Sequence, residues 1–201
     1  MGRRRPRVRR TADRYQWEKD RALLPEGERR RTGATEHDTG LAKDDLAFDI
    51  DYVTERAGAE LAGRFGVPEG TRLLHRRYRT SPGESEEPLS LIDSWLVYDL
   101  VASNPDLLTP ENEPWPGGTQ HQLSTVGIEV DRVVDEVSGR PAEPGEARIL
   151  GLSPGRPVLV LRKTSIDTTG RVVEVAEVTL PGDRAEVVST TELRRWPHPP
   201  E

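Results

Sequence analysis

A six-residue motif, Phe65-Gly66-Val67-Pro68-Glu69-Gly70, recurs 85 residues later as Leu150-Gly151-Leu152-Ser153-Pro154-Gly155. In each copy, a glycine is predicted to end a helix, and a Pro/Gly turn then leads into a two-stranded hairpin. The match continues at the same offset into the next strand, at Leu73 and Val158, Leu74 and Leu159, and Arg77 and Arg162. Two copies are too few for a solenoid, so the sequence predicts one pseudo-symmetric α+β domain with a mostly antiparallel sheet. A crevice between its halves is then a natural place for a ligand.

The segments around the motif predict the remaining elements of the domain. Apolar residues occupy every second position from Leu46 to Tyr52, which indicates a strand with one buried face. In chain order we expect a strand over 46–52, a helix over 56–65, strands over 71–80 and 88–97, a broken helix over 99–108, a short helix over 119–126, a strand over 128–137, a helix over 143–150, a hairpin of strands over 156–167 and 171–180, and a last strand over 185–190.

The beginning of the chain differs in composition from the rest. Residues 1–31 carry twelve Arg or Lys and five Asp or Glu, a balance of +7, whereas the remainder carries a balance of −13. Apart from a short helix over 15–24, the first 45 residues show no periodic pattern and few apolar side chains. We therefore expect a largely disordered basic linker over 1–45, a folded domain over 46–195 and a tail over 196–201. Weak, non-specific contact with nucleic-acid phosphates is expected at Arg3, Arg4, Arg5, Arg7, Arg9 and Arg10.

Several classes of protein are excluded by what the sequence lacks. The chain has no cysteine, and no window approaches the roughly 18 consecutive apolar residues of a membrane span. The four histidines are scattered without ligand spacing, and the common nucleotide-binding and hydrolase motifs are missing. Asp49 and Asp51 are better interpreted as carboxylates on the wet face of a strand than as a catalytic pair. We expect a cytoplasmic protein with no metal, no cofactor and no membrane association.

Four residues have the chemistry of an anion site. Arg77 and Arg79 are two positions apart on a predicted strand, so their side chains share a face. Thr119 opens a helix after a Gly-rich approach, where free N–H groups and the helix dipole favour an anion. Glu174 lies in the final hairpin and can accept from hydroxyl or amine donors. The alternative interpretation makes the arginines solvated or paired with nearby acids, and Thr119 a simple helix cap.

The later copy of the motif and the segments after it resemble the end of a UTRA domain, the effector-binding domain of HutC-subfamily GntR-type bacterial transcription regulators. The matching residues are 150–158, Leu161-Arg162-Lys163-Thr164, Asp167, 170–174 and Pro181-Gly182-Asp183-Arg184. Residues 65–79 and 118–128 resemble earlier blocks of the same domain. The resemblance spans about residues 46–192, and the Arg-rich, Lys-poor composition is similar to that of actinobacterial members.

The resemblance implies a chorismate-lyase-like fold, dimerisation through this domain, and a small, often acidic or phosphorylated effector that changes DNA affinity. Members that bind phosphorylated sugars use two strand arginines, a Ser or Thr at a helix start and a late Glu. These roles fall on Arg77, Arg79, Thr119 and Glu174. Ile92 and Leu180 replace an acidic and an aromatic position of that pattern, which favours an anionic effector other than a sugar phosphate.

The DNA-binding domain of the family, an N-terminal winged helix-turn-helix, has no counterpart in the first 45 residues. The basic run Arg3–Arg10 is similar to the stretch that follows the wing. We therefore expect an effector domain with its linker, a homodimer that binds a small anionic metabolite and reaches DNA only through an absent or upstream winged helix. Two alternatives stay open: a chorismate-lyase-like enzyme, which we do not favour, and a purely structural dimerisation module.

Overall fold

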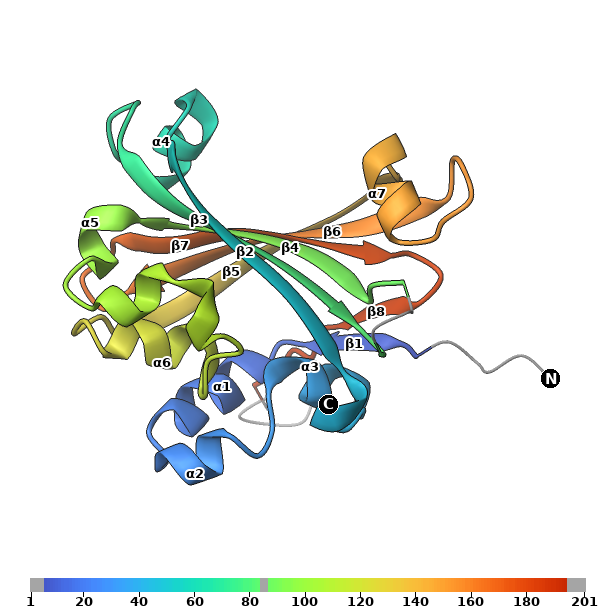
Figure 1. Ribbon diagram of the computed structural model, residues 1–201, viewed down its shortest axis with the longest axis horizontal. Helices are drawn as coiled ribbons and strands as arrows, with labels where there is room; N and C mark the ends of the chain where they lie inside the picture. The colour runs from blue at the N-terminus through green and yellow to red at the C-terminus, as the bar shows by residue number, and fades with distance from the viewer. Residues whose placement is uncertain (1–5, 84–86, 195–201) are drawn as a thin grey trace, which may run out of the picture.

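The computed structural model describes residues 6–83 and 87–194, which are built around a twisted six-stranded sheet (Figure 1). All neighbouring strands in this sheet are antiparallel. In spatial order the strands are β2 (Ala47–Arg56), β3 (Arg72–Ser81), β4 (Ser90–Val97), β7 (Val172–Pro181), β6 (Pro157–Asp167) and β5 (Val130–Pro141). The predicted α+β domain with a mostly antiparallel sheet is confirmed.

Helices cover the two faces of the sheet unequally (Figure 1). On one face, α4 (Ala59–Phe65) and α7 (Pro144–Ile149) stand at opposite ends. The other face carries α6 (Gly118–Ser124) and the N-terminal helices α1 (Arg14–Ala22), α2 (Glu26–Arg29) and α3 (Ala34–Thr39). The remaining elements are α5 (Tyr98–Val101), the 3-10 turns η1 (Lys43–Asp45), η2 (Pro105–Leu108) and η3 (Pro110–Asn112), and the short strands β1 (Val8–Thr11) and β8 (Ala185–Val188).

The repeated motif marks two equivalent halves of the sheet. The order β2, α4, β3, β4 in the first half is repeated as β5, α7, β6, β7, and the halves meet where β4 pairs with β7. Gly66 and Gly151 both adopt the left-handed conformation, with φ of 67° and 61°, where α4 and α7 end. Glycine is the residue that takes this conformation without strain, which explains why both copies contain it.

The hydrophobic core lies on both faces of the sheet. Leu73 is buried against Phe65 of α4, whereas its neighbour Leu74 is buried on the opposite face with Leu123 of α6. Val158, the repeat equivalent of Leu73, is buried below α7. Strand β3 is therefore apolar on both sides at its beginning, and this double burial hides which of its later side chains face the helical layer.

Between α4 and α7 the sheet carries a row of charged side chains. They are cross-strand neighbours from one edge to the other: Asp51, Arg77, Asp93, Glu177, Arg162 and Glu136. Arg77 pairs with Asp51, and Arg162 pairs with Glu177 at 3.3 Å. Each of these six side chains is between 33% and 62% exposed, so the row lies on the solvated face of the sheet. Opposite charges on facing positions stabilise neighbouring strands modestly, and Asp93 and Glu177 are the one facing pair of like charge in the row.

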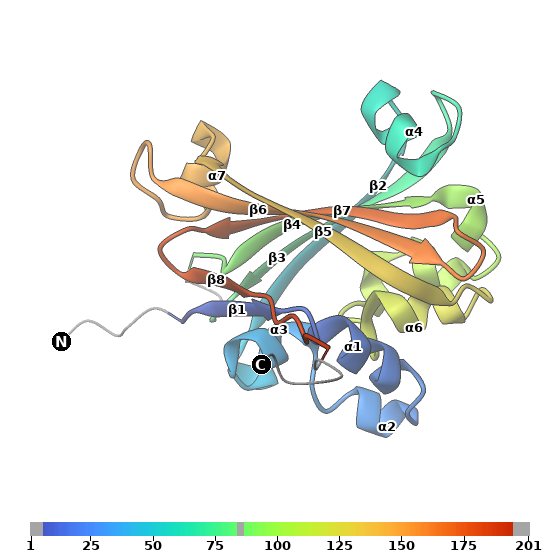
Figure 2. The same ribbon diagram turned by 180° about the vertical axis from the view of Figure 1, so that it is seen from behind.

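The first part of the chain is folded, which differs from the expected disordered linker over 1–45. Strand β1 pairs in parallel with β8 from the far end of the domain, as Figure 2 shows from behind. Val8 is buried with Leu161 and Val178 of the sheet. The carboxylate of Asp38 lies 2.9 Å from Arg10 and 3.2 Å from Arg14, and all three side chains are buried.

The reason for this difference is that residues 6–45 are held by long-range pairing and buried ion pairs, which a local count of apolar residues does not detect. The burial of Arg10 also corrects the expectation that it contacts nucleic-acid phosphates. Arg7 and Arg9 are exposed. Arg3, Arg4, Arg5 and the predicted tail over 196–201 lie outside the described residues.

Candidate functional site

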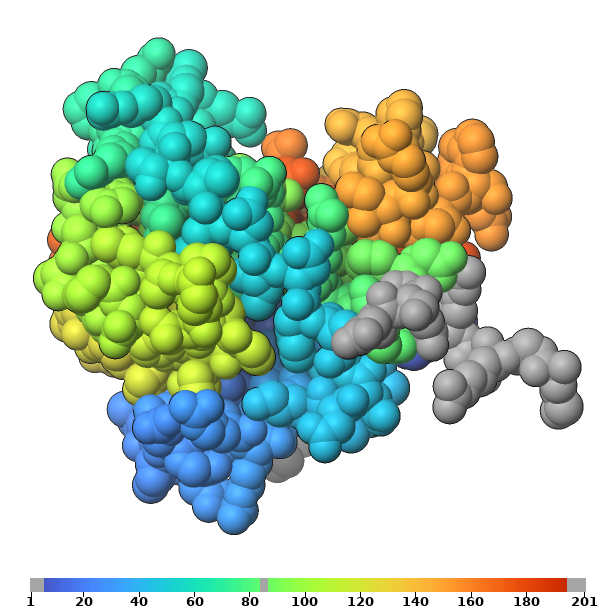
Figure 3. Space-filling model, in the orientation of Figure 1, coloured from blue at the N-terminus to red at the C-terminus, as the bar shows by residue number. Residues whose placement is uncertain are grey.

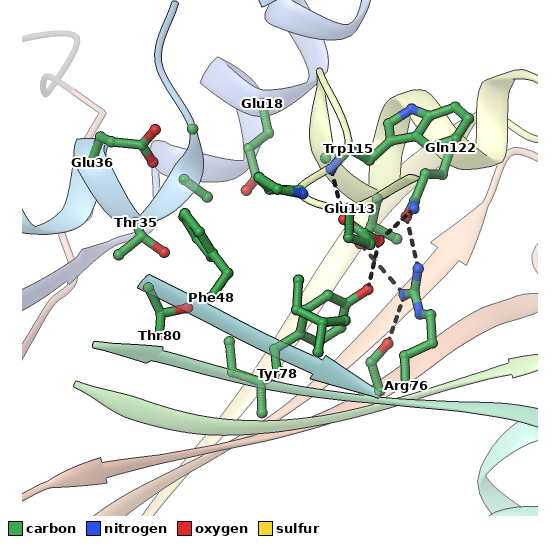
Figure 4. A pocket seen from close by; sticks show the side chains of 18 of the residues that line it. Glu18, Thr35, Glu36, Phe48, Arg76, Tyr78, Thr80, Glu113, Trp115 and Gln122 are labelled. Atoms are coloured by element: carbon green, nitrogen blue, oxygen red, sulfur yellow. Dashed lines mark hydrogen bonds between the residues drawn. The ribbon is translucent and has the colours of Figure 1, made fainter. Parts of the chain in front are cut away.

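A cavity separates the helical face of the sheet from the N-terminal helices and the loop before α6 (Figure 4). Its volume is about 180 Å³, close to cavities that admit a benzene-sized molecule. The sheet contributes Phe48, Ile50, Arg76, Tyr78, Thr80, Ile92, Ser94, Lys163, Glu174, Ala176 and Val178. The loop and α6 contribute Glu113, Pro114, Trp115, Pro116, Gly118, Thr119 and Gln122. The N-terminal segment contributes Arg10, Arg14, Glu18, Arg21, Arg29, Arg30, Gly33, Ala34, Thr35, Glu36 and Lys43.

Arg76 is the central cation of the cavity floor and is only 1% exposed. Its Nη1 donates to Gln122 Oε1 at 2.7 Å, as the close-up in Figure 4 shows. Its Nη2 donates to Ser94 Oγ at 2.7 Å. The same Nη2 lies 3.1 Å from Glu174 Oε1 and 3.5 Å from Thr119 Oγ1. Its Nε has no hydrogen-bond partner among the described residues.

Glu174 is the carboxylate that balances this cation. Besides Arg76, it accepts from Ser94 Oγ at 2.8 Å and Ser165 Oγ at 3.0 Å, and Lys163 Nζ lies 2.7 Å away. Burial by itself raises a carboxyl pKa, but Lys163 and Arg76 outweigh it and hold the pKa of Glu174 at about 2. Burial likewise opposes the charge on Arg76, yet Tyr78 and Tyr52, which ionise only in strong alkali, and the nearby Glu carboxylates keep its pKa above the ordinary value. Both groups are therefore charged at neutral pH.

Glu113 fastens the loop before α6 to the sheet. One of its carboxylate oxygens accepts from Tyr52, from Tyr78 at 3.0 Å and from Gln122 at 2.8 Å, and the other accepts from the Trp115 backbone N–H at 2.6 Å. Burial raises the pKa of Tyr52 to about 12 and that of Tyr78 well above its ordinary value, so both phenols act as neutral donors. This network positions Gln122, which in turn orients Arg76.

The cavity carries an excess of positive charge. Its lining includes eight Arg or Lys side chains and four Glu side chains. Such an excess in a partly dehydrated space attracts anions and disfavours cations. Within the described part of the chain, no group of His, Asp and Glu side chains is arranged to hold a metal ion. In the same part of the chain, no helix is long and apolar enough to span a membrane.

The four residues singled out from sequence are divided between the two faces of the sheet. Thr119 and Glu174 line the cavity. Arg77 and Arg79 point to the opposite, solvated face, where their side chains are 46% exposed and pair with Asp51 and Asp49. The expected convergence of these arginines with Thr119 is therefore not seen, and their pairing with neighbouring acids matches the alternative interpretation. The carboxylates of Asp49 and Asp51 also lie on the wet face, as anticipated.

The cavity arginine is instead Arg76, one position earlier on the same strand. Side chains alternate across a strand, so a parity error of one residue exchanges the two faces. A usable signal was present in Tyr78, because an aromatic side chain favours the buried face of a strand, and residues two positions apart share a face. Ser94, Gln122 and Lys163 are cavity residues that sequence reasoning missed. Thr119 makes no side-chain capping bond, since α6 begins at Gly118.

The family model of the UTRA domain matches residues 50–186. The chain belongs to the UTRA domain family. This match lies within the predicted folded domain over 46–195, and the chorismate-lyase-like fold implied by the resemblance is confirmed by solved structures of GntR-family effector domains.

Curated relatives of this UTRA domain are transcriptional regulators by name. An uncharacterised HTH-type regulator of Streptomyces coelicolor is 28% identical over 121 residues, which cover 60% of this chain and 44% of the relative. An HTH-type regulator of Mycobacterium tuberculosis is 29% identical over 133 residues, which cover 63% and 45% of the two chains. The chain thus spans about half the length of the curated relatives it matches.

Solved structures with this UTRA fold include one of a transcriptional regulator assigned to the GntR family. Its TM-score is 0.63 at 26% identity, and the match covers 80% of this chain and 64% of that one. PhnF from Mycobacterium smegmatis has a TM-score of 0.67 at 19% identity and covers 96% of this chain and 78% of its own. The isolated effector domain of PhnF covers 75% of this chain with a TM-score of 0.61 at 21% identity. The PhnF structures share the fold with this UTRA domain.

Proposed function

We propose that this UTRA domain binds a small anionic metabolite in the cavity and is the effector-sensing module of a HutC-subfamily GntR-type regulator. The observation that carries the proposal is the buried guanidinium of Arg76, which lines the cavity with one N–H lacking an acceptor among the described residues. Buried donors are usually satisfied, so a missing acceptor favours a ligand with a carboxylate or phosphate oxygen.

The surroundings of Arg76 support a ligand that combines an anionic group with a polar body. Ser94 and Thr119 offer hydroxyls, and Gln122 offers an amide. Ile92 and Phe48 supply the apolar part of the wall. Pockets that combine apolar walls with a few fixed polar groups are typical of specific small-molecule sites, and a volume of about 180 Å³ favours a compact metabolite.

The same proposal covers how the signal reaches DNA. The relatives are HTH-type regulators, and the matched segment covers only 44% and 45% of their lengths, so we infer that DNA is read by a winged helix-turn-helix outside these 201 residues. Arg7 and Arg9 then add weak, non-specific phosphate contacts at most. We infer a homodimer in the cytoplasm, since dimers suit a reader of two DNA half-sites. The Arg-rich composition favours an actinobacterial origin.

A thermal-shift screen tests the proposal. The full chain is heated with small carboxylates, phosphorylated metabolites and a neutral analogue of each. A ligand present at 100 times its Kd stabilises the folded state by about 2.7 kcal/mol, which raises the Tm of a chain of this size by roughly 5 °C or more. We expect such a rise with at least one acid and none with its neutral analogue. If no acid raises the Tm, or if neutral analogues act equally, the proposal fails.

A further inference from the structure

Arg21 is a cavity-lining arginine in the last turn of α1, a helix of the N-terminal segment. It is 6% exposed, and its Nε and Nη1 have no hydrogen-bond partner among the described residues. Its guanidinium lies over the ring of Trp17, 5.0 Å from the ring centre. Figure 3 shows the N-terminal helices, in blue, packed against the yellow-green residues around α6, and α1 contacts α6. Arg21 therefore sits in a wall opposite the sheet floor.

The other basic side chains of the cavity differ from Arg21 because each has an acceptor or is exposed. Arg10 and Arg14 share the carboxylate of Asp38, and Arg76 and Lys163 share that of Glu174. The remaining three are Arg29, which donates to the Pro116 carbonyl, Arg30, which pairs with Glu26, and Lys43, which is exposed. Among the described residues, Arg21 is the one buried cation of the cavity without an acidic partner or a hydrogen-bond acceptor.

A buried charge without a partner is unfavourable, and natural structures rarely keep one without a function. Burial lowers the pKa of Arg21; Glu18 and Glu36 oppose this effect from a distance, and Arg14 and Arg29 add to it. A guanidinium stays protonated even so, and it is stabilised by whatever anion enters the cavity.

We propose that Arg21 is an anion-binding residue of this cavity and takes a carboxylate or phosphate group of the ligand. The inference rests on the proposed function, which it deepens by naming a second contact. Arg21 lies outside the segment 50–186 that matches the UTRA family, whereas Arg76 lies inside it. A ligand that contacts both ties the N-terminal segment to the sheet, so occupancy of the cavity stabilises the position of α1.

The test compares four versions of the full chain with two probes, inorganic phosphate and malonate. The variants are Arg21→Met, which keeps the alkyl stem and removes the charge, Arg76→Met as the reference on the floor, and Arg31→Met as the control. Arg31 is 74% exposed and pairs with Glu28 on the outer surface. Affinity is measured by calorimetry, and hydrogen exchange in α1 is measured with and without each anion.

We expect Arg21→Met to weaken binding of at least one probe by about tenfold or more, whereas Arg31→Met leaves it unchanged. We also expect the anion to slow exchange in α1 of the wild type and to lose that effect in Arg21→Met. Without any anion, Arg21→Met should melt no lower than the wild type, because it removes an unpaired buried charge.

Three outcomes overturn the inference. The first is that Arg21→Met binds the anion with wild-type affinity while Arg76→Met binds it more weakly. This result rejects Arg21 as a ligand contact and leaves the proposed function unaffected. The second is a Tm of Arg21→Met below that of the wild type without anion, since this reveals a structural role. The third is no binding of either probe to the wild type, in which case the metabolite screen alone decides the proposed function.

Discussion

The guanidinium of Arg76 lies 3.1 Å from the carboxylate of Glu174, and both side chains are almost completely buried. Arg76 belongs to β3 in the first half of the pseudo-symmetric sheet, and Glu174 belongs to β7 in the second half. Their ion pair therefore crosses the junction of the two halves, where the cavity lies. The same two charged side chains are buried in the sheet and form part of the cavity floor.

The first prediction concerns acid stability. Because the pKa of Glu174 is lowered from 4.5 to about 2, its carboxylate stabilises the fold fully above pH 4.5 and loses that contribution as the pH falls toward 2. The loss amounts to about 3 kcal/mol. Urea unfolding between pH 2 and 5 should therefore show a shallower decline for Glu174→Gln than for the wild type. Parallel curves for the two proteins would contradict the assignment of this pKa.

The second prediction uses the neighbours Arg76 and Arg77 as a matched pair. Arg76→Met leaves the Glu174 carboxylate buried with Lys163 as its only cation, and we expect a loss of about 3 kcal/mol in the free energy of unfolding. Arg77→Met removes a half-exposed arginine, so its cost should be below about 0.5 kcal/mol. Urea denaturation at pH 7 measures both. Equal losses would mean that the two side chains are not on opposite faces as described.

The third prediction tests whether the N-terminal segment is folded. Asp38→Asn removes the carboxylate that Arg10 and Arg14 share and leaves Glu18, 3.0 Å from Arg14, as the remaining acidic partner of Arg14. This change should cost about 2–4 kcal/mol in that segment. We expect faster hydrogen exchange in β1 and α1, while exchange in β4 and β7 stays slow. If β1 and α1 exchange as fast in the wild type as in an unfolded peptide, the segment is a disordered linker after all.

The fourth prediction is a dimer. Light scattering of the full chain should give twice the 22.5 kDa mass of one chain, with the mass decreasing on dilution only near the dissociation constant. A mass of 22.5 kDa that does not change with concentration would contradict the dimer.

The fold was largely predictable because its signals are local. Gly66 and Gly151 end helices, and the Pro/Gly turns after them start hairpins, so the repeat revealed two equivalent halves. Strand β2 was predicted to end at residue 52, whereas its pairing with β3 continues to Arg56. This extension depends on contacts with another strand, which the local sequence pattern does not contain. Long-range pairing also explains why the N-terminal segment was not predicted to fold. Val8 is buried in a strand that pairs with β8, from the other end of the chain.

The cavity was predictable only in part. Glu174 and Thr119 line it, and the hairpin and the helix start that hold them were clear in the sequence; their role in binding stays a prediction. The arginine was displaced by one position, because Leu73 and Leu74 are both buried and leave the parity of β3 undetermined. Arg21 could not be predicted as a cavity residue, because the burial of its guanidinium without a hydrogen-bond acceptor is visible only in the folded chain.

The most direct test of the central claim, that the cavity binds an anionic effector at Arg76, is a calorimetric titration. The acid that raises the Tm most in the screen is titrated into the wild type, Arg76→Met and Arg77→Met. We predict that Arg77→Met keeps the wild-type Kd and that Arg76→Met weakens binding by about 2 kcal/mol or more, a loss of about thirtyfold. Undiminished affinity in a folded Arg76→Met variant, or a loss confined to Arg77→Met, would contradict the claim.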